Sequence, residues 1–215
     1  MTTYEDIRFR FLNIKRIKFA EKRRRLLKNT DFTIISNNCW GGMTYEAYNL
    51  QKQSPTVGLF FMASDYIKFV SNLHEYLKMD LRFINVSESK WKDSKEIKDI
   101  TYPIGKLGDV EIFFMHYKDE SEALSKWTRR IKRINWNKLL IKFNDQNGCT
   151  RDDVEAFIKL PYKNKIFFTS HDWKGINDDS IIRIRQFPKK ESIMTSYEPY
   201  GRNRYLNIEK LINSL

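Results

Sequence analysis

The sequence predicts a Rossmann-like α/β fold, in which a largely parallel sheet is flanked by helices. Two observations indicate this fold. Short apolar runs rich in β-branched and aromatic residues alternate with helical patterns, and polar or glycine-containing stretches follow these runs. The chain has 215 residues, 41% of them hydrophobic, so it can bury a substantial core. We also expect a basic helix at the N-terminus and a small antiparallel portion near the C-terminus.

The first 30 residues carry ten basic and three acidic side chains, and they supply +7 of the net charge of +12. Four apolar side chains lie among them at roughly helical spacing: Ile7, Phe11, Ile14 and Phe19. This pattern predicts a basic amphipathic helix over residues 1–30, followed by one α/β domain over residues 31–215. Such a helix either lies on an anionic membrane surface or packs its apolar stripe against the protein's own sheet.

The remaining elements follow from the periodicity of apolar residues. Strands are expected at 32–35, 81–86, 110–115, 139–143 and 166–169. Helices are expected before the turn at 53–55 and over 65–78, 120–134, 152–160 and 206–215. Residues 87–108 are polar and contain a proline and two glycines, which predicts a loop or an insertion. Residues 181–185 alternate apolar with basic side chains, as an edge strand or a small hairpin does.

Candidate site residues follow from the geometry of open α/β sheets, which bind ligands at the carboxyl ends of their parallel strands. Four stretches directly follow predicted strands: 36–42, 116–117, 144–147 and 170–173. They contain four candidate catalytic residues, Cys39, His116, Asp145 and His171. They also contain the candidate substrate-binding residues Asn37, Asn38, Trp40, Gly41, Gly42 and Asp172. We expect the four catalytic candidates to line one cleft.

Cys39 is the candidate nucleophile. It lies at a predicted strand-to-helix turn, where a helix N-terminus lowers the pKa of a thiol and the following glycines let backbone amides approach an oxyanion. His116 or His171 would act as its base. Asp145 or Asp172 would orient that base. The alternative is that Cys39 is a small, inert core residue. For Asn37 and Asn38, the alternative to substrate binding is that they only shape the turn.

A second basic run is interleaved with two tryptophans and contains Lys126, Arg129, Arg130, Lys132 and Arg133. Basic segments suit a phosphorylated small molecule, an anionic lipid or nucleic acid, or they form a merely solvated face. Arg129 and Arg130 are our candidates for contacts to the phosphates of a donor. Because no nucleic-acid-binding motif accompanies the charge, we expect no specific nucleic acid partner.

The sequence gives no reason to expect a metal or a cofactor. Its Cys, His and Asp residues lack zinc-site spacing, and neither a dinucleotide fingerprint nor a P-loop is present. Cys39 and Cys149 have no spacing typical of a redox pair, which favours a reduced, cytoplasmic setting. We expect neither a spanning helix nor a secretory signal, so any membrane association would be peripheral, at the inner face.

Six stretches of the sequence are distinctive together: ISNNCWGG (35–42), QSPTVGLFF (53–61), DYIKFVSNLHEYL (65–77), YPIGKLGDVEIFFMHY (102–117), KWTRRIKRINW (126–136) and LPYKNKIFFT (160–169). Through them the chain resembles a bacterial family known as domain of unknown function 1919, over roughly residues 30–190. Members of that family are often labelled exopolysaccharide biosynthesis proteins and sometimes acetyltransferases. The resemblance implies a bacterial cytosolic protein that works near surface-polysaccharide assembly, and it carries no catalytic residues over to this chain.

Two functions are compatible with these features. The first is a transferase of exopolysaccharide or capsule biosynthesis, which moves an acyl or glycosyl group from an activated anionic donor to a sugar. The acyl version ranks ahead because no D-x-D motif is present, and Cys39 or His116 would be its reactive group. The second is a non-catalytic binding module that docks on an anionic partner or a membrane surface.

Overall fold

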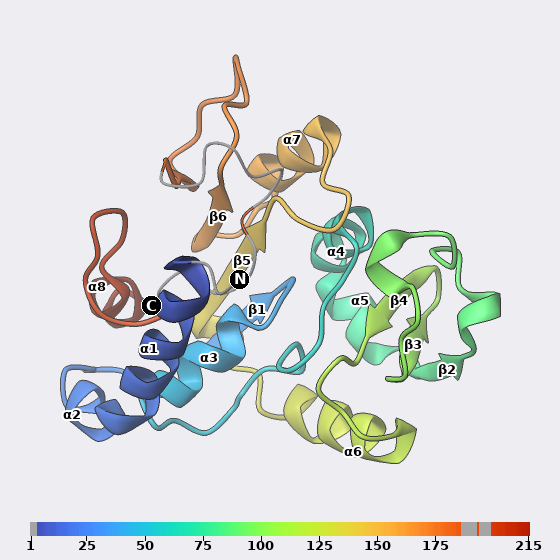
Figure 1. Ribbon diagram of the computed structural model, residues 1–215, viewed down its shortest axis with the longest axis horizontal. Coiled ribbons are helices and arrows are strands. Elements are labelled where there is room, and N and C mark those ends of the chain that lie inside the picture. Colours follow the sequence, from blue (N-terminus) through green and yellow to red (C-terminus); the bar gives the residue numbers. More distant parts are fainter. Residues whose placement is uncertain (1–3, 186–192, 194–198) are drawn as a thin grey trace.

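A computed structural model describes residues 4–185, 193 and 199–215 of the chain. The fold contains a four-stranded parallel sheet with helices on both of its faces and a separate three-stranded antiparallel sheet (Figure 1). The predicted α/β class with a largely parallel sheet is therefore confirmed.

The parallel sheet has the spatial order β1 (Thr33–Ser36), β5 (Leu139–Asn144), β6 (Lys165–Thr169) and β7 (Ile181–Arg183). Successive side chains of a strand point to opposite faces, and the buried residues follow this alternation. Ile34 and Leu140 belong to one core cluster, whereas Ile35 and Ile141 belong to the other. Each face of the sheet is thus covered by its own layer of apolar side chains.

Helices cover both faces of this sheet. The Ile34 face packs against α3 (Trp40–Ala47) and α8 (Ile208–Asn213), and the Ile35 face packs against α4 (Ala63–Ser71) and α7 (Arg151–Lys159). The helix expected over 65–78 is interrupted at Asn72, where ψ is 43°, and continues as α5 (Leu73–Lys78). Trp127 of α6 (Glu120–Ile131) packs against Phe69 and Phe114, which joins α6 to α4 and the small sheet.

The antiparallel sheet consists of β2 (Arg82–Ile84), β3 (Ile104–Leu107) and β4 (Val110–Phe113). The strand expected at 110–115 therefore pairs with β3 and does not join the parallel sheet. The reason is the two-residue loop Gly108-Asp109, in which Gly108 has a φ of +58° and closes a hairpin. Part of the loop expected over 87–108 is consequently a strand, preceded by the 3₁₀ turns Val86–Glu88 and Lys95–Ile97.

The antiparallel portion expected near the C-terminus lies instead in the middle of the chain. At the C-terminal side, β7 is a parallel edge strand because Ile181 and Ile182 pair with β6 in the same direction. The only antiparallel pairing among the described residues after β7 is a single bridge between Arg202 and Asn207. The expected closing helix is present as α8.

The basic N-terminal segment forms α1 (Tyr4–Lys18) and α2 (Ala20–Arg24). Arg23 connects them to the domain, since its Nη1 donates hydrogen bonds to the carbonyl oxygens of Arg16 (2.8 Å) and Ala47 (3.1 Å). The helical prediction is confirmed. Of the two alternatives for the apolar stripe, packing on the protein's own sheet does not occur, because Ile7, Phe11 and Ile14 are exposed. In the described part of the chain, no helix has the length and apolarity needed to cross a bilayer.

Candidate active site

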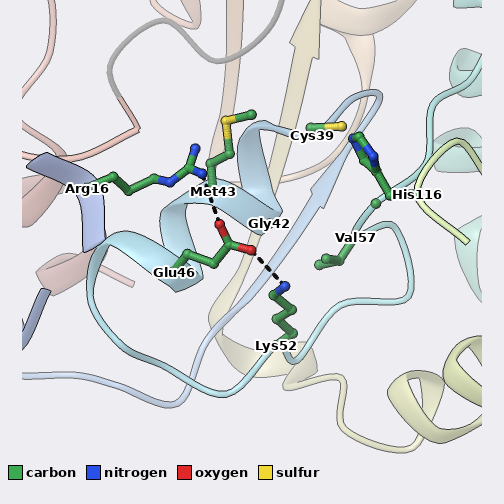
Figure 2. Close-up of a pocket in the computed structure, with 9 residues that line it drawn as sticks. Arg16, Cys39, Gly42, Met43, Glu46, Lys52, Val57 and His116 are labelled. Carbon is green, nitrogen blue, oxygen red and sulfur yellow. Dashed lines mark hydrogen bonds and ion pairs between the residues drawn. The ribbon is translucent and has the colours of Figure 1, made fainter. Parts of the chain in front are cut away.

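A pocket of about 290 Å³ lies beside α3, where the β1–α3 turn meets segments from distant parts of the chain (Figure 2). Its lining residues come from α1, α3, the loop after α3 and the segment after β4: Arg16, Cys39, Gly42, Met43, Glu46, Lys52, Val57, Gly58 and His116. The pocket brings together two of the four catalytic candidates, Cys39 and His116. Cys39 follows β1 by three residues, so the pocket adjoins the carboxyl end of the parallel sheet.

Cys39 precedes the first residue of α3 and forms a buried part of the pocket wall, with only 5% of its surface exposed. Figure 2 shows its sulfur pointing toward the imidazole of His116. Burial raises the pKa of the thiol to about 11, and the nearby charge of Lys142 only partly opposes this shift. The expected lowering of the thiol pKa by the helix N-terminus is therefore wrong. Cys39 is a protonated thiol at neutral pH.

The raised pKa of Cys39 predicts a specific loss of stability in alkali. The folded protein keeps the thiol proton between pH 9, the ordinary pKa, and about 11, whereas the unfolded chain releases it. Stability therefore falls by about 1.4 kcal/mol per pH unit in this window on account of this group. Urea unfolding measured from pH 8 to about 11 should show a shallower decline for Cys39→Ala than for the wild type. Parallel declines in the two proteins would contradict the assignment.

His116 is exposed at the mouth of the pocket and is held in place by the loop that precedes α4. Its backbone N–H donates a hydrogen bond of 3.0 Å to the carbonyl oxygen of Gly58. Gly58 has a φ of +80°, and a Cβ atom there would lie 3.2 Å from the ring of Tyr117. A glycine is needed at this position because it combines the left-handed backbone with the close approach of the segment that carries His116.

Arg130 supports this wall of the pocket from behind. It is buried, and its Nη1 donates hydrogen bonds to the carbonyl oxygen of Val57 (3.2 Å) and to the hydroxyl of Tyr117 (2.6 Å). The Tyr117 hydroxyl in turn donates to the same Val57 oxygen at 2.5 Å. Arg130 was expected to contact a donor phosphate, but its guanidinium is hydrogen-bonded within the protein instead. Arg129 is exposed on α6. Neither arginine lines the pocket.

Three charged side chains lie along the pocket. Glu46 lies between two cations, with its carboxylate 3.3 Å from Nη2 of Arg16 and 2.8 Å from Nζ of Lys52 (Figure 2). The Nε of Arg16 is buried without a hydrogen-bond partner. The three side chains leave an excess of one positive charge, which makes the pocket suitable for an anionic group.

Asn37 and Asn38, expected to contact a substrate, are both buried and bonded within the protein. The side chain of Asn37 donates to the carbonyl oxygen of Asn144 and accepts from its N–H, both at 3.1 Å. The Nδ2 of Asn38 donates to Oε1 of Gln146 at 2.8 Å. These bonds fix the carboxyl ends of β1 and β5 to each other. The structure therefore favours the turn-shaping interpretation of both residues.

Lys142 is a buried polar residue that sequence reasoning did not select. Its Nζ donates a 2.8 Å hydrogen bond to Oδ1 of Asn38 and lies 5.8 Å from the ring centres of Trp40 and Phe168. Complete burial lowers the pKa of its amine well below the ordinary value. The available signal was a lysine inside the apolar run LLIKF, on the same strand face as Leu140. Lys142 positions the turn that carries Cys39.

The Trp40-Gly41-Gly42 stretch is packed closely against the sheet and the following loop. Trp40 is buried with its ring centre 5.8 Å from that of Phe168. A Cβ atom on Gly41 would lie 3.2 Å from Ile34 Cγ2, and one on Gly42 would lie 2.9 Å from Val57 Cγ1. These glycines let α3 approach its neighbours. Gly42 also lines the pocket, which a larger residue would narrow.

Asp145 lies away from the Cys39 pocket, on a second pocket of about 260 Å³. Its carboxylate accepts hydrogen bonds from the hydroxyl of Thr169 (2.6 Å) and from the N–H groups of Ser170 (2.9 Å) and Ile193 (2.8 Å). Because both carboxylate oxygens are bonded within the protein, Asp145 ties the ends of β5 and β6 to the segment around Ile193. This arrangement indicates a structural role.

His171 and Asp172 follow β6 on the same side as Asp145. The Nδ1 of His171 lies 3.6 Å from Oδ2 of Asp145, and the exposed carboxylate of Asp172 pairs with Arg183 at 3.1 Å. The structure thus groups the catalytic candidates in two pairs, Cys39 with His116 and Asp145 with His171, and not in one cleft. Among the described residues, no group of three or more His, Cys, Asp or Glu is arranged to hold a metal ion.

The comparison with known proteins shows the family of the chain. The sequence model of the protein family "Domain of unknown function (DUF1919)" matches residues 10–213 of this chain. The chain belongs to the DUF1919 family. An "Uncharacterized protein" of Haemophilus influenzae is 34% identical over 191 residues, which cover 88% of this chain and 86% of the relative. The DUF1919 match is longer than the expected span of 30–190, and it includes every residue that lines the Cys39–His116 pocket.

Proposed function

We propose that this DUF1919 protein is an acyltransferase that binds an activated anionic donor in the Cys39–His116 pocket. One observation carries the proposal. The buried turn that carries Cys39 and the exposed His116 from the segment after β4 share a single pocket, and Arg16 and Lys52 supply cations to it. An exposed imidazole and cationic side chains gathered in one concavity are typical of active sites.

His116 acts as the general base in this proposal. Its imidazole accepts the proton of an acceptor hydroxyl while that oxygen forms a bond to the acyl carbon of a thioester donor. The carbon–sulfur bond of the donor breaks, and the same proton passes to the departing thiolate. Cys39 serves as a pocket wall and not as the attacking group, because its raised pKa leaves little thiolate at neutral pH.

The size of the pocket limits which part of a donor it takes. At about 290 Å³, it lies at the small end of the range of ligand sites. It therefore fits an acyl group with the adjoining part of its carrier, while the rest of the carrier lies outside. Phosphates of that carrier would meet Arg16 and Lys52 at the rim.

The sugar acceptor and the setting are part of the same proposal. We assign a sugar hydroxyl of exopolysaccharide or capsule biosynthesis as the acceptor and the cytoplasm as the compartment. The exopolysaccharide label that many DUF1919 members carry supports this assignment. The absence of a D-x-D motif supports acyl transfer over glycosyl transfer.

A transfer assay tests the proposed function. The purified chain is incubated with isotope-labelled acetyl-CoA and a set of sugars and nucleotide sugars, and the label is followed into the sugar fraction. We expect label transfer by the wild type and transfer at least about 100-fold slower by a His116→Asn variant. A wild-type chain that neither transfers label nor binds acetyl-CoA or any nucleotide sugar would overturn the transferase assignment and leave a non-catalytic binding module.

Glu46 provides a test of the charge of the pocket. Its carboxylate pairs with both Arg16 and Lys52, so an incoming phosphate has to compete with it. Glu46→Gln should therefore raise the affinity for coenzyme A by about three- to fivefold, the range of a partly exposed ion pair. Isothermal titration measures this change, with Glu75→Gln as the control because Glu75 pairs with Lys78 on the exposed face of α5, outside the pocket. An unchanged or weaker affinity of Glu46→Gln would argue against anion binding at this rim.

A further inference from the structure

The helix α1 carries apolar side chains on the face turned away from the protein. Ile7, Phe11 and Ile14 are 59%, 56% and 65% exposed. Their spacing of four and three residues places them on one face of the helix. Arg16 lies on the opposite side and forms an ion pair with Glu46 of α3. A helix that packs on its own domain usually turns its apolar side chains toward the domain and its polar side chains toward solvent. In α1 these apolar side chains face solvent, so they are available to bind a partner.

Basic side chains border this apolar face. Arg10, Lys15 and Lys18 are exposed on α1, and they are followed by the exposed basic side chains of α2. The ammonium of Lys15 lies 4.3 Å from the centre of the Phe11 ring, and that of Lys18 lies 5.8 Å from the Phe19 ring. The partner of this surface must therefore accept apolar groups and carry negative charge close beside them.

A membrane surface has both properties. We propose that the outer face of α1 binds bilayers that contain anionic phospholipids, with the apolar side chains in the headgroup region and the basic side chains at lipid phosphates. A second copy of the chain is the poorer partner, because it would bring an equally basic helix against this one. The face is a single row of bulky side chains on a lone helix, which suits a fluid surface better than a shaped protein groove.

This orientation brings the pocket close to the lipid. Arg16 lines the pocket from the side of α1 opposite the apolar face. A helix with its side chains is roughly 10–12 Å across, so bound α1 would hold the pocket at about that distance from the bilayer. An acceptor carried on a lipid would then lie near His116. This last step rests on the proposed function, whereas membrane binding itself does not.

Vesicle sedimentation of the full chain tests the proposal. We expect binding to vesicles of phosphatidylcholine mixed with phosphatidylglycerol, weak binding to phosphatidylcholine alone, and a loss of binding at high salt. The triple variant Ile7→Ser/Phe11→Ser/Ile14→Ser should partition at least about tenfold less. Lys15→Gln/Lys18→Gln should also bind anionic vesicles about 30-fold more weakly. Because all five side chains are exposed, circular dichroism should show both variants folded.

Matched controls distinguish binding through the outer face of α1 from nonspecific adsorption of the protein to vesicles. Met79→Ser/Leu124→Ser removes two other exposed apolar side chains, Lys98→Gln/Lys163→Gln removes two other exposed charges, and both should sediment as the wild type does. Equal sedimentation of the triple variant and the wild type would overturn the proposal. So would equal binding to neutral and anionic vesicles, or a dimer in light scattering that the triple variant converts to a monomer. Failure of acyl transfer alone would leave this proposal standing, because sedimentation does not depend on it.

Discussion

Replacing Asp145 with alanine is expected to lower the free energy of unfolding by about 3–5 kcal/mol. The carboxylate is buried and accepts hydrogen bonds from the Thr169 hydroxyl and from the N–H groups of Ser170 and Ile193. Alanine would leave three donors without this acceptor in a buried region, and each unsatisfied group carries a desolvation cost. Urea unfolding followed by circular dichroism measures the loss.

Asp172→Ala is the matched control for this prediction. Asp172 follows β6 as Asp145 follows β5, but it is exposed and pairs with Arg183 at the surface. Its replacement should change the free energy of unfolding by no more than about 0.5 kcal/mol. An Asp145→Ala variant as stable as the wild type would contradict the structural role of this carboxylate. It would favour the sequence-based interpretation, in which Asp145 orients a catalytic histidine.

Replacing His116 with asparagine is expected to reduce the rate of acyl transfer by about 10²- to 10⁴-fold, which is the usual contribution of a general base. The imidazole is exposed at the mouth of the pocket, and its backbone bond to Gly58 does not depend on the side chain. Stability should therefore stay within about 0.5 kcal/mol of the wild type. Donor affinity should also remain, because Arg16 and Lys52 are untouched.

His74→Asn is the control for the loss of an imidazole. His74 stacks on Trp136, with ring centres 3.7 Å apart, and it does not line the pocket. Its replacement should leave the transfer rate within about twofold of the wild type. A His116→Asn variant that retains the wild-type rate would exclude this residue as the base.

The parallel sheet could be predicted from the sequence because each of its strands has a local signature. Buried strands such as β6 contain a short apolar run, and the polar residues that follow the strands mark the carboxyl edge. The sequence does not predict the hairpin of β3 and β4, because Gly105 and Gly108 lie in a polar stretch that is typical of a loop. The Gly108-Asp109 loop between two apolar runs was the available signal for it.

The candidate site could be predicted only in part. The sequence predicts Cys39 and His116 as site residues because each follows a predicted parallel strand. The structure brings them together, although β4, the strand before His116, belongs to the antiparallel sheet. The sequence does not indicate Arg16, Lys52 or Gly58, because their place in the pocket depends on how α1 and the loop after α3 pack on the sheet. No local pattern reports such packing. The burial of Asp145 and Asn38 likewise depends on partners more than 20 residues away in the sequence.

Binding of acetyl-CoA by isothermal titration, to the wild type and to two charge-reversed variants, tests most directly whether the pocket holds an anionic donor. Lys52→Glu reverses a charge in the pocket, and Lys163→Glu reverses an exposed charge outside it. We predict that the wild type and Lys163→Glu bind acetyl-CoA equally well and that Lys52→Glu binds it at least about tenfold more weakly. Equal affinity of all three proteins, or no binding by the wild type, would contradict the assignment of the Cys39–His116 pocket as the donor site.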